Sequence, residues 1–466
     1  MKRALWISLV LSLGCGPSAG SSAYRVEARA ALPGTAATPR DLPAPPASPV
    51  VRRTALAPIE RGQLGNGLPL FVLTRREMPT VSFSFVTTAN GSSTRATDVL
   101  FTDAAECALY TLDDNRYGKS LSYWDSRHAI VPSGSGLTAY ASYLAPLGPS
   151  ALDLWLEFLG EGTIDREAMK CAQTGVESRQ ALEAESATLA HRALAANVFP
   201  AGHPLAAWNL EELAKVTPDR IRARAADGFV PGRTAIVAVG DISLAEVVQR
   251  AEARWGKRRA LYAPPPVVSS AVAPRTTFLA KDAPTLDGLF AAVGAVGVAP
   301  TSPDFPAQRV ALALLEEEMF ERLRLERGDA YAVDSRHRLA PLADLATIGV
   351  HVPLDRAQAS LDVMAAVIRE RIAEPPSAAK LAAAKEAARK SYLASLDSNL
   401  EASIWLAQLW GAGLDPSKLE SIAAAVDAVD AQAVQRFLQS HWGPSAATYT
   451  VVGPLAGAPE PLHAPR

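Results

Sequence analysis

A sequence pattern in the middle of the chain is repeated near its end. GFVPGRTAIVAVGD carries its closing glycine at position 240, and HWGPSAATYTVVGP carries its own at position 453, 213 residues later. The same offset, without a gap, also relates Val216 to Val429, Phe229 to Trp442 and Pro231 to Pro444. Each passage follows a helical pattern and reads as a turn and then a buried strand. We therefore predict that the chain contains two copies of the same structural unit, related by an internal duplication.

The remaining patterns predict an α+β fold in each half. Runs rich in Val, Phe and Thr at 70–74 and 80–88 predict strands, and the patterns at 150–160 and 167–197 predict helices. The proline-rich segment 261–276 (LYAPPPVVSSAVAPRT) is typical of a linker. We expect two halves, 57–260 and 277–466, each a β-sheet backed by helices.

The first fifteen residues predict export. Lys2 and Arg3 precede an apolar stretch at 4–13, which is too short for a permanent membrane span, and Gly14 and Cys15 follow. A small residue before a cysteine resembles a bacterial lipobox, so we expect a lipid on Cys15. A cleaved signal with an accidental cysteine is the alternative. We expect a lipoprotein of the cell envelope, facing the periplasm from the outer membrane, with residues 16–56 as a flexible Pro-, Ala- and Ser-rich tether.

Charge and cysteine content exclude two classes of protein. Lys and Arg total 46 against 48 Asp and Glu, with no arginine-rich cluster, so nucleic acid is not an expected partner. Beyond Cys15 only Cys107 and Cys171 remain, so the chain is no disulfide-stapled scaffold. Whether Cys107 and Cys171 pair is left open.

Several segments, taken in order, resemble the M16 metallopeptidases, the family of pitrilysin and the mitochondrial processing peptidase. LGNGLPLFVL (64–73) is similar to the family's opening strand, and the stretch 198–241 is similar to its succession of Gly-His-Pro, helix, Tyr-x-Pro and Val-Val-Gly-Asp. FERLRLERGDAYAV (320–333) and the closing VVGP continue the likeness. The resemblance runs from about 64 to 454.

The zinc motif of that family is altered in this chain. The motif is His-x-x-Glu-His on a helix, where residues four apart share a face and aim two imidazoles at one metal. Here the helix reads FTDAAECALY, so the resemblance places the ligands on Asp103 and Cys107 and the general base on Glu106. The third ligand falls on Glu177 or its neighbour Ser178. No two of the seven histidines are close enough in sequence to replace the missing pair.

These substitutions predict a degenerate zinc site without metal or cofactor and without catalytic residues. A site of Asp103, Cys107 and Glu177 is the alternative, because each of these side chains can bind zinc. The simplest interpretation is a polar patch on an Ala-rich core helix. A base without a metal has no activated water to use, so Glu106 is expected to be structural or to face substrate.

The resemblance also implies a substrate-binding pair in the C-terminal half, at Arg324 and Tyr331. Arg offers a planar fork of donors and Tyr a hydroxyl, which suit the carbonyls of an extended peptide. A surface arginine and an ordinary strand tyrosine are the alternative. The family's glycine-rich turn before this stretch is replaced by LLEEEMFER, and the offset of 213 makes Glu316 the counterpart of Asp103.

The sequence thus predicts a catalytically inactive M16-like subunit that binds peptide and complements a separate zinc-bearing M16 peptidase, as a heterodimer in the cell envelope. Two alternatives remain. One is a stand-alone peptide- or protein-binding lipoprotein, and the other is a metallopeptidase with Asp, Cys and Glu ligands. The peptide, the partner and the open or closed arrangement of the halves are not predicted.

Overall fold

The computed structural model describes residues 57–88, 95–111, 116–124, 127–134, 136–161, 164–182, 185–200, 203, 205, 210–261, 274, 276–286, 288–337, 339–458 and 460–465. The predicted signal, Cys15 and the tether lie outside these residues, as does most of the predicted linker. Among the residues described, no helix is long and apolar enough to cross a membrane.

The N-terminal half is built on a six-stranded sheet in the order β1-β2-β6-β3-β5-β4. Its strands are β1 (Glu60–Gln63), β2 (Pro69–Thr74), β3 (Thr80–Thr87), β4 (Arg127–Pro132), β5 (Leu137–Leu144) and β6 (Thr234–Gly240). Its helices are α1 (Arg95–Thr111), α2 (Arg116–Tyr123), α3 (Gly148–Glu161), α4 (Arg166–Leu182), α5 (Ser186–Val198), α6 (Leu210–Ala214), α7 (Pro218–Ala226) and α8 (Leu244–Trp255).

The C-terminal half is built on a five-stranded sheet in the order β7-β11-β8-β10-β9. Its strands are β7 (Phe278–Asp282), β8 (Leu289–Val296), β9 (Val333–Arg336), β10 (Leu345–Val352) and β11 (Thr448–Gly453). Its longer helices are α9 (Phe305–Phe320), α10 (Ala357–Ala373), α11 (Ala378–Ala394), α12 (Asn399–Gly411), α13 (Leu419–Asp427) and α14 (Ala431–His441), and a π-helical segment (Glu321–Glu326) continues α9.

The two sheets have the same topology, which confirms the predicted two-half α+β architecture. β2 and β6 run parallel, as do β7 and β11, while the other equivalent pairs are antiparallel in both halves. The strands β6 and β11 end at Gly240 and Gly453, with φ angles of 130° and 153°. A Cβ at Gly240 would lie 2.2 Å from the Thr80 carbonyl oxygen. The repeated glycine is therefore required by the strand that passes beside it.

Predicted and observed elements agree closely except in one helical stretch. The strands expected at 70–74 and 80–88 are β2 and β3, and the helix expected at 150–160 is α3. The stretch 167–197, expected to be one helix, forms two, α4 and α5. Tertiary packing decides this break, because α4 packs on α1 in its own half whereas α5 packs on the other half's sheet.

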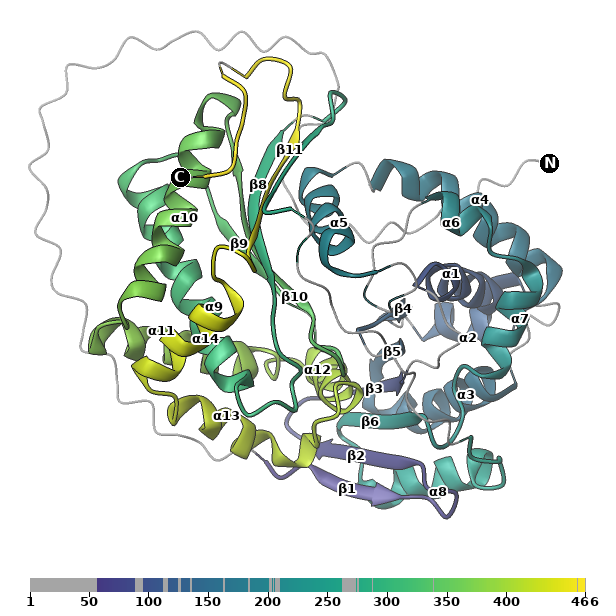
Figure 1. Cartoon of the computed structure of the whole chain (residues 1–466). Coiled ribbons are helices and arrows are strands. Elements are labelled where there is room, and N and C mark those ends of the chain that lie inside the picture. Colours follow the sequence, from purple (N-terminus) through teal and green to yellow (C-terminus); the bar gives the residue numbers. More distant parts are fainter. Residues whose placement is uncertain are drawn as a thin grey trace, which may run out of the picture. The chain divides into compact units, whose positions relative to one another are not determined.

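Each half lends one helix to the other's sheet, as Figure 1 shows for α5 beside β8 and α12 beside β3. Strand β3 alternates large and small side chains: Phe83 and Phe85 face the core of its own half, while Ser84 faces α12 and meets Ser403 at 2.9 Å. On β8, Phe290 and its alternate neighbours face α5 in the same way. Burial on both faces explains why β8 is a continuous apolar run and why the small serines of β3 are buried as well.

Candidate functional site

Helix α1 brings the three predicted zinc-site positions of this helix to one face. Glu106 and Cys107 stand three and four residues after Asp103, and all three are half-buried, whereas Ala104 and Ala108 beside them in sequence are fully buried in the core. The sequence placed these residues correctly on a helix. What they do there depends on their partners on α4 and β4.

Cys107 is joined to Cys171 of α4 by a disulfide, with 6.1 Å between the two Cα atoms. This answers the question of pairing that the sequence left open. A metal ligand must be a thiolate, and a sulfur atom in a disulfide carries no such charge. In the oxidised protein, Cys107 is therefore a cross-link between two helices and not a ligand. Cys171 is exposed, so the bond lies within reach of solvent.

Glu106 is held by the edge strand β4. Its Oε1 atom accepts a hydrogen bond of 3.0 Å from the Ile130 backbone N–H. One turn further along α1, the Tyr110 hydroxyl lies 2.8 Å from His128 Nε2, also on β4. Burial raises the pKa of Tyr110 above its ordinary value, and the Glu106 carboxylate adds to the rise. Glu106 thus fastens α1 to the sheet, which favours the structural role among those expected from the sequence.

The fourth predicted position, Glu177, lies on α4, six residues after Cys171. Its side chain is outside the described part of the chain, so its assignment as a ligand position stays a prediction. Among the side chains that the structure describes, no group of three or more His, Cys, Asp or Glu residues is arranged to hold a metal ion.

The second predicted feature, in the C-terminal half, sits where α9 changes to a π-helix. The π-segment Glu321–Glu326 is followed by Gly328, at φ 65°, and by the buried Asp329. The Asp329 carboxylate pairs with Arg327 at 2.5 Å, and its backbone N–H donates to the Leu323 carbonyl at 2.8 Å. These bonds fix the loop that leads to β9. π-Helical turns are frequent at functional sites, and no sequence pattern predicted this one.

Arg324 and Tyr331 meet across this loop. The Arg324 guanidinium carbon lies 4.3 Å from the centre of the Tyr331 ring. Tyr331 is 81% exposed, and Leu325, which follows Arg324 in sequence, is 67% exposed, which is unusual for large apolar side chains. Stacking on the guanidinium holds the ring in place while the hydroxyl and the guanidinium edge remain open to a ligand. The sequence predicted the two residues but not their contact.

The counterpart of Glu316 was wrongly predicted. Strand register makes Ile130 of β4 equivalent to Ser335 of β9. Glu316 accepts a hydrogen bond from the Ser335 hydroxyl, as Glu106 does from Ile130. Glu316 is therefore the counterpart of Glu106 and not of Asp103. The offset of 213 fails here because it holds only for the later part of each half: α5 and α12 begin at 186 and 399, but α1 and α9 at 95 and 305.

The three glutamates of LLEEEMFER form the end of α9 and not a loop. Glu318 is almost fully buried, lying 2.8 Å from Lys380 Nζ and 3.3 Å from Arg371 Nε. Burial raises the pKa of Glu316, while its bond to Ser335 opposes the rise. Glu318 thus joins α9 to α10 and α11, and Glu316 joins it to β9, which gives both carboxylates a structural role.

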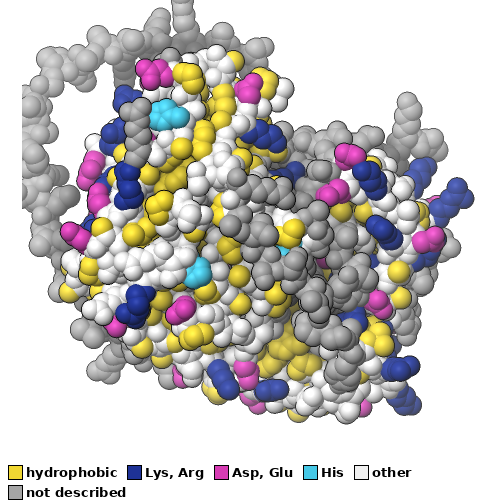
Figure 2. All heavy atoms as spheres, in the orientation of Figure 1, with side chains coloured by type: hydrophobic (Ala, Val, Ile, Leu, Met, Phe, Trp, Pro, Cys, Tyr) yellow, Lys and Arg dark blue, Asp and Glu magenta, His cyan; other side chains and the backbone are white. Residues whose placement is uncertain are grey.

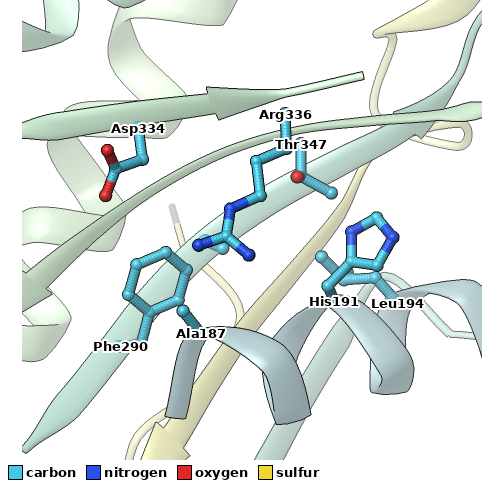
Figure 3. A pocket seen from close by; sticks show the side chains of 8 residues that line it. Ala187, His191, Leu194, Phe290, Asp334, Arg336 and Thr347 are labelled. Atoms are coloured by element: carbon cyan, nitrogen blue, oxygen red, sulfur yellow. The ribbon is translucent and has the colours of Figure 1, made fainter. Parts of the chain in front are cut away.

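A pocket that sequence reasoning missed lies between α5 and the C-terminal sheet (Figure 3). Its lining includes Ala187 and His191 from α5, Phe290 from β8, and Asp334 and Arg336 from β9. The alternation of polar residues in Val-Asp-Ser-Arg was a usable signal, since every second residue of an edge strand points to the same side.

One family model matches part of the chain, and solved structures share its fold. Residues 215–388 match the family model described as the peptidase M16 inactive domain. The family match is confined to this segment and lies mostly in the C-terminal half of the chain. No curated protein matches the chain. The matched segment includes Arg324 and Tyr331 but not α1, so the chemistry of α1 rests on its own residues.

Solved structures share this fold at low sequence identity. The peptidase M16 inactive domain from Pseudomonas fluorescens is 18% identical, with a TM-score of 0.72, and the similarity covers 86% of this chain and 100% of that one. A protease from Helicobacter pylori is 13% identical, with a TM-score of 0.73 over 85% and 99% of the two chains. A chain of Complex III2 from Candida albicans is 13% identical, with a TM-score of 0.72 over 86% and 97%.

Proposed function

We propose that this protein is a non-catalytic M16 subunit that binds peptide and complements a separate, zinc-bearing M16 peptidase. The observation that carries the proposal is the Cys107–Cys171 disulfide. It occupies the second ligand position with a sulfur that cannot bind metal, while Asp103 stands at the first. A hydrolytic zinc site without histidines and with one ligand oxidised has no means of activating water.

The C-terminal half supplies the peptide-binding part of the proposal. Arg324 and Tyr331 form an ordered, exposed pair with free hydrogen-bonding edges, and two bonds to Asp329 fix the loop between them. The similarity to a chain of Complex III2, a protein within a larger assembly, supports a subunit role. The division of labour is then a peptide-binding subunit beside a metal-bearing one.

The first experiment measures metal and activity on the oxidised protein. We expect no stoichiometric zinc by elemental analysis and no chelator-sensitive peptidase activity. The same measurements on Cys107→Ala serve as the control. One tightly held zinc per wild-type chain, lost together with peptidase activity in Cys107→Ala, would overturn the proposal in favour of a metallopeptidase with unusual ligands.

The second experiment tests the partnership. The tagged protein is purified from its native host, and we expect a co-purifying M16 protein with an intact His-x-x-Glu-His motif. Peptide turnover by the reconstituted pair is then measured for Arg324→Ala, with Arg76→Ala as the matched control, because Arg76 is an exposed arginine in the other half. Loss of a charge-assisted bond costs about 1.5 to 3 kcal/mol, so turnover should fall about ten- to a hundredfold at low substrate. Peptide binding without any M16 partner favours a stand-alone binding protein.

We also propose an envelope location, with lipid on Cys15. A disulfide between helices is typical of proteins that fold in an oxidising compartment, which supports export. The Cys15→Ala variant should leave the membrane fraction, since the lipid is its expected anchor. Unchanged membrane fractionation of that variant would count against lipidation.

A further inference from the structure

The edge strand β9 presents two opposite faces with different neighbours. Val333 is buried in the core of its half, and the Ser335 hydroxyl bonds to Glu316 on α9. Because side chains alternate along a strand, Asp334 and Arg336 point to the other face, where α5 packs (Figure 3). β9 pairs with β10 and is the last strand of its sheet. Its outer edge is not paired with another described strand.

Residues of α5 and β8 line the pocket on that face. On α5, Ala187 and His191 stand one turn apart, and Phe290 forms the wall opposite. Gly294 on β8 leaves room for α5, because a Cβ there would lie 3.1 Å from both Leu194 and Thr347. Figure 3 shows the Arg336 side chain extending above this space, between the Phe290 ring and the His191 imidazole.

Arg336 differs from the structural arginines of the same half. Arg322 is engaged by Glu370 at 2.8 Å, and Arg371 by Glu318 at 3.3 Å. Arg336 is exposed, and no ion pair or hydrogen bond joins it to a described residue. Asp334 lies on the same face but makes no ion pair with it in the described part of the chain. The guanidinium thus keeps its fork of donors available beside an apolar wall.

We propose that Arg336 is a carboxylate-binding subsite for an extended peptide lying along the outer edge of β9. The proposal rests on the peptide-binding function proposed above and adds a preference for peptides that carry a carboxylate at this position. An extended segment beside β9 directs every second side chain to the α5 side, where Arg336 stands. Its guanidinium binds a planar carboxylate through two parallel hydrogen bonds. The carboxylate comes from an acidic side chain or from the peptide's C-terminus.

The experiment compares three fluorescein-labelled heptapeptides of alternating Thr and Val, using fluorescence anisotropy. The first has a central Glu and an amidated end, the second a central Gln and an amidated end, and the third a central Gln and a free C-terminal carboxylate. We expect wild-type protein to bind one of the two carboxylate peptides about tenfold more tightly than the neutral one. The peptide that gains identifies the source of the carboxylate.

Substitutions at Arg336 and at other charged residues test whether the preference for a carboxylate depends on Arg336 or on the overall charge of the protein. Arg336→Gln should abolish the preference and leave the affinity for the neutral peptide unchanged. Arg369→Gln, on α10 behind the sheet, is the matched control and should keep the preference. Asp334→Asn removes a neighbouring negative charge and should strengthen the preference for the carboxylate peptide. Thermal melts check folding, and Arg336→Lys, which keeps the charge but not the fork, should lose part of the preference.

The outcomes distinguish this inference from the proposed function. If all three peptides bind wild-type protein equally, or if the preference survives in Arg336→Gln, the subsite is overturned while peptide binding stands. If none of the peptides binds either the isolated protein or its reconstituted complex, both proposals fail.

Discussion

The corner formed by α1 and β4 in the N-terminal half and that formed by α9 and β9 in the C-terminal half are equivalent in topology but are stabilised differently. In the first, the Glu106 carboxylate bonds to backbone at a half-exposed surface, and a disulfide ties the helix to α4. In the second, Glu316 is bonded to Ser335. Nearby, Arg309 is buried, hydrogen-bonded to Ser391 and stacked 5.1 Å from the ring centre of Tyr392.

The difference teaches how a duplicated site diverges. The C-terminal corner contains polar groups that bond to one another, Arg309 to Ser391 and Ser335 to Glu316, so it contributes to packing. The N-terminal corner keeps polar side chains near solvent and relies on a covalent bond between its helices. Burial of polar groups in the C-terminal corner and the disulfide in the N-terminal corner make different predictions for stability.

The largest expected effect comes from a buried ion pair in the N-terminal half. Arg224 and Asp98 lie 2.6 Å apart and are almost fully buried. Arg224→Met leaves the Asp98 charge in the core and should cost about 3 to 5 kcal/mol of unfolding free energy. Arg322→Met removes a half-exposed pair with Glu370 in the other half and should cost about 0 to 1 kcal/mol. Denaturant melts of both variants measure the contrast, and equal losses would contradict it.

Removing the disulfide should have the next largest effect. Its two cysteines are 64 residues apart in sequence, and opening such a loop typically costs about 2 to 4 kcal/mol. The double variant Cys107→Ser, Cys171→Ser should lose this stability, and hydrogen exchange should rise in α1 and α4 but not in α9 and α11. Addition of dithiothreitol to wild type should reproduce the loss and should leave the double variant unchanged. A uniform rise in exchange over both halves would show that the bond does not act locally.

A smaller effect concerns pH and one histidine in each half. Burial lowers the pKa of His337 well below its ordinary value, and Arg309 adds to the fall. Burial also lowers the pKa of His203, which Asp344 partly opposes. The folded state holds both imidazoles neutral, whereas the unfolded chain takes up protons near pH 6.5. Their contribution to stability is thus complete above about pH 6.5 and is lost as the pH falls.

The two histidines should differ in how much of this dependence they carry. Thermal melts between pH 7 and pH 5 should show the steepest loss in wild type. His337→Leu should flatten the curve more than His203→Leu, since its pKa is lowered further; the slope due to His337 is at most about 1.4 kcal/mol per pH unit. Identical curves for wild type and His337→Leu would show that this histidine is not held neutral.

The smallest expected effect compares two exposed tyrosines. Tyr331→Phe removes one neutral hydrogen bond to peptide, worth about 0.5 to 1.5 kcal/mol, so peptide handling should weaken about two- to tenfold. Tyr110→Phe, in the other half, removes a hydroxyl bonded to His128 and should leave peptide handling unchanged. Turnover by the reconstituted complex measures both. A larger loss for Tyr110→Phe would move the binding surface to α1.

The sequence predicted what depends on local pattern and failed where distant segments decide. The repeated strand ending in glycine predicted both sheets, because a buried strand and its turn are determined by residues adjacent in sequence. The constant offset failed for Glu316, because unequal segments between the strands and helices change the spacing. The Cys107–Cys171 bond and the Arg324–Tyr331 contact depend on how α1 meets α4 and how a π-turn bends the chain. The pocket at Arg336 needs α5 from one half and β9 from the other, which no local pattern contains.

Because α5 and α12 each pack against the sheet of the opposite half, neither half has a complete core of its own. Leu194 on α5 is buried against Phe290 and Val452 of the opposite sheet, and Leu406 on α12 is buried against the first sheet. A hinge motion that parted the sheets would return these side chains to water, at about 25 cal/mol per Å² of apolar surface. The chain therefore resembles a domain-swapped dimer whose two copies are joined into one polypeptide, and separating the halves would expose apolar surface of both.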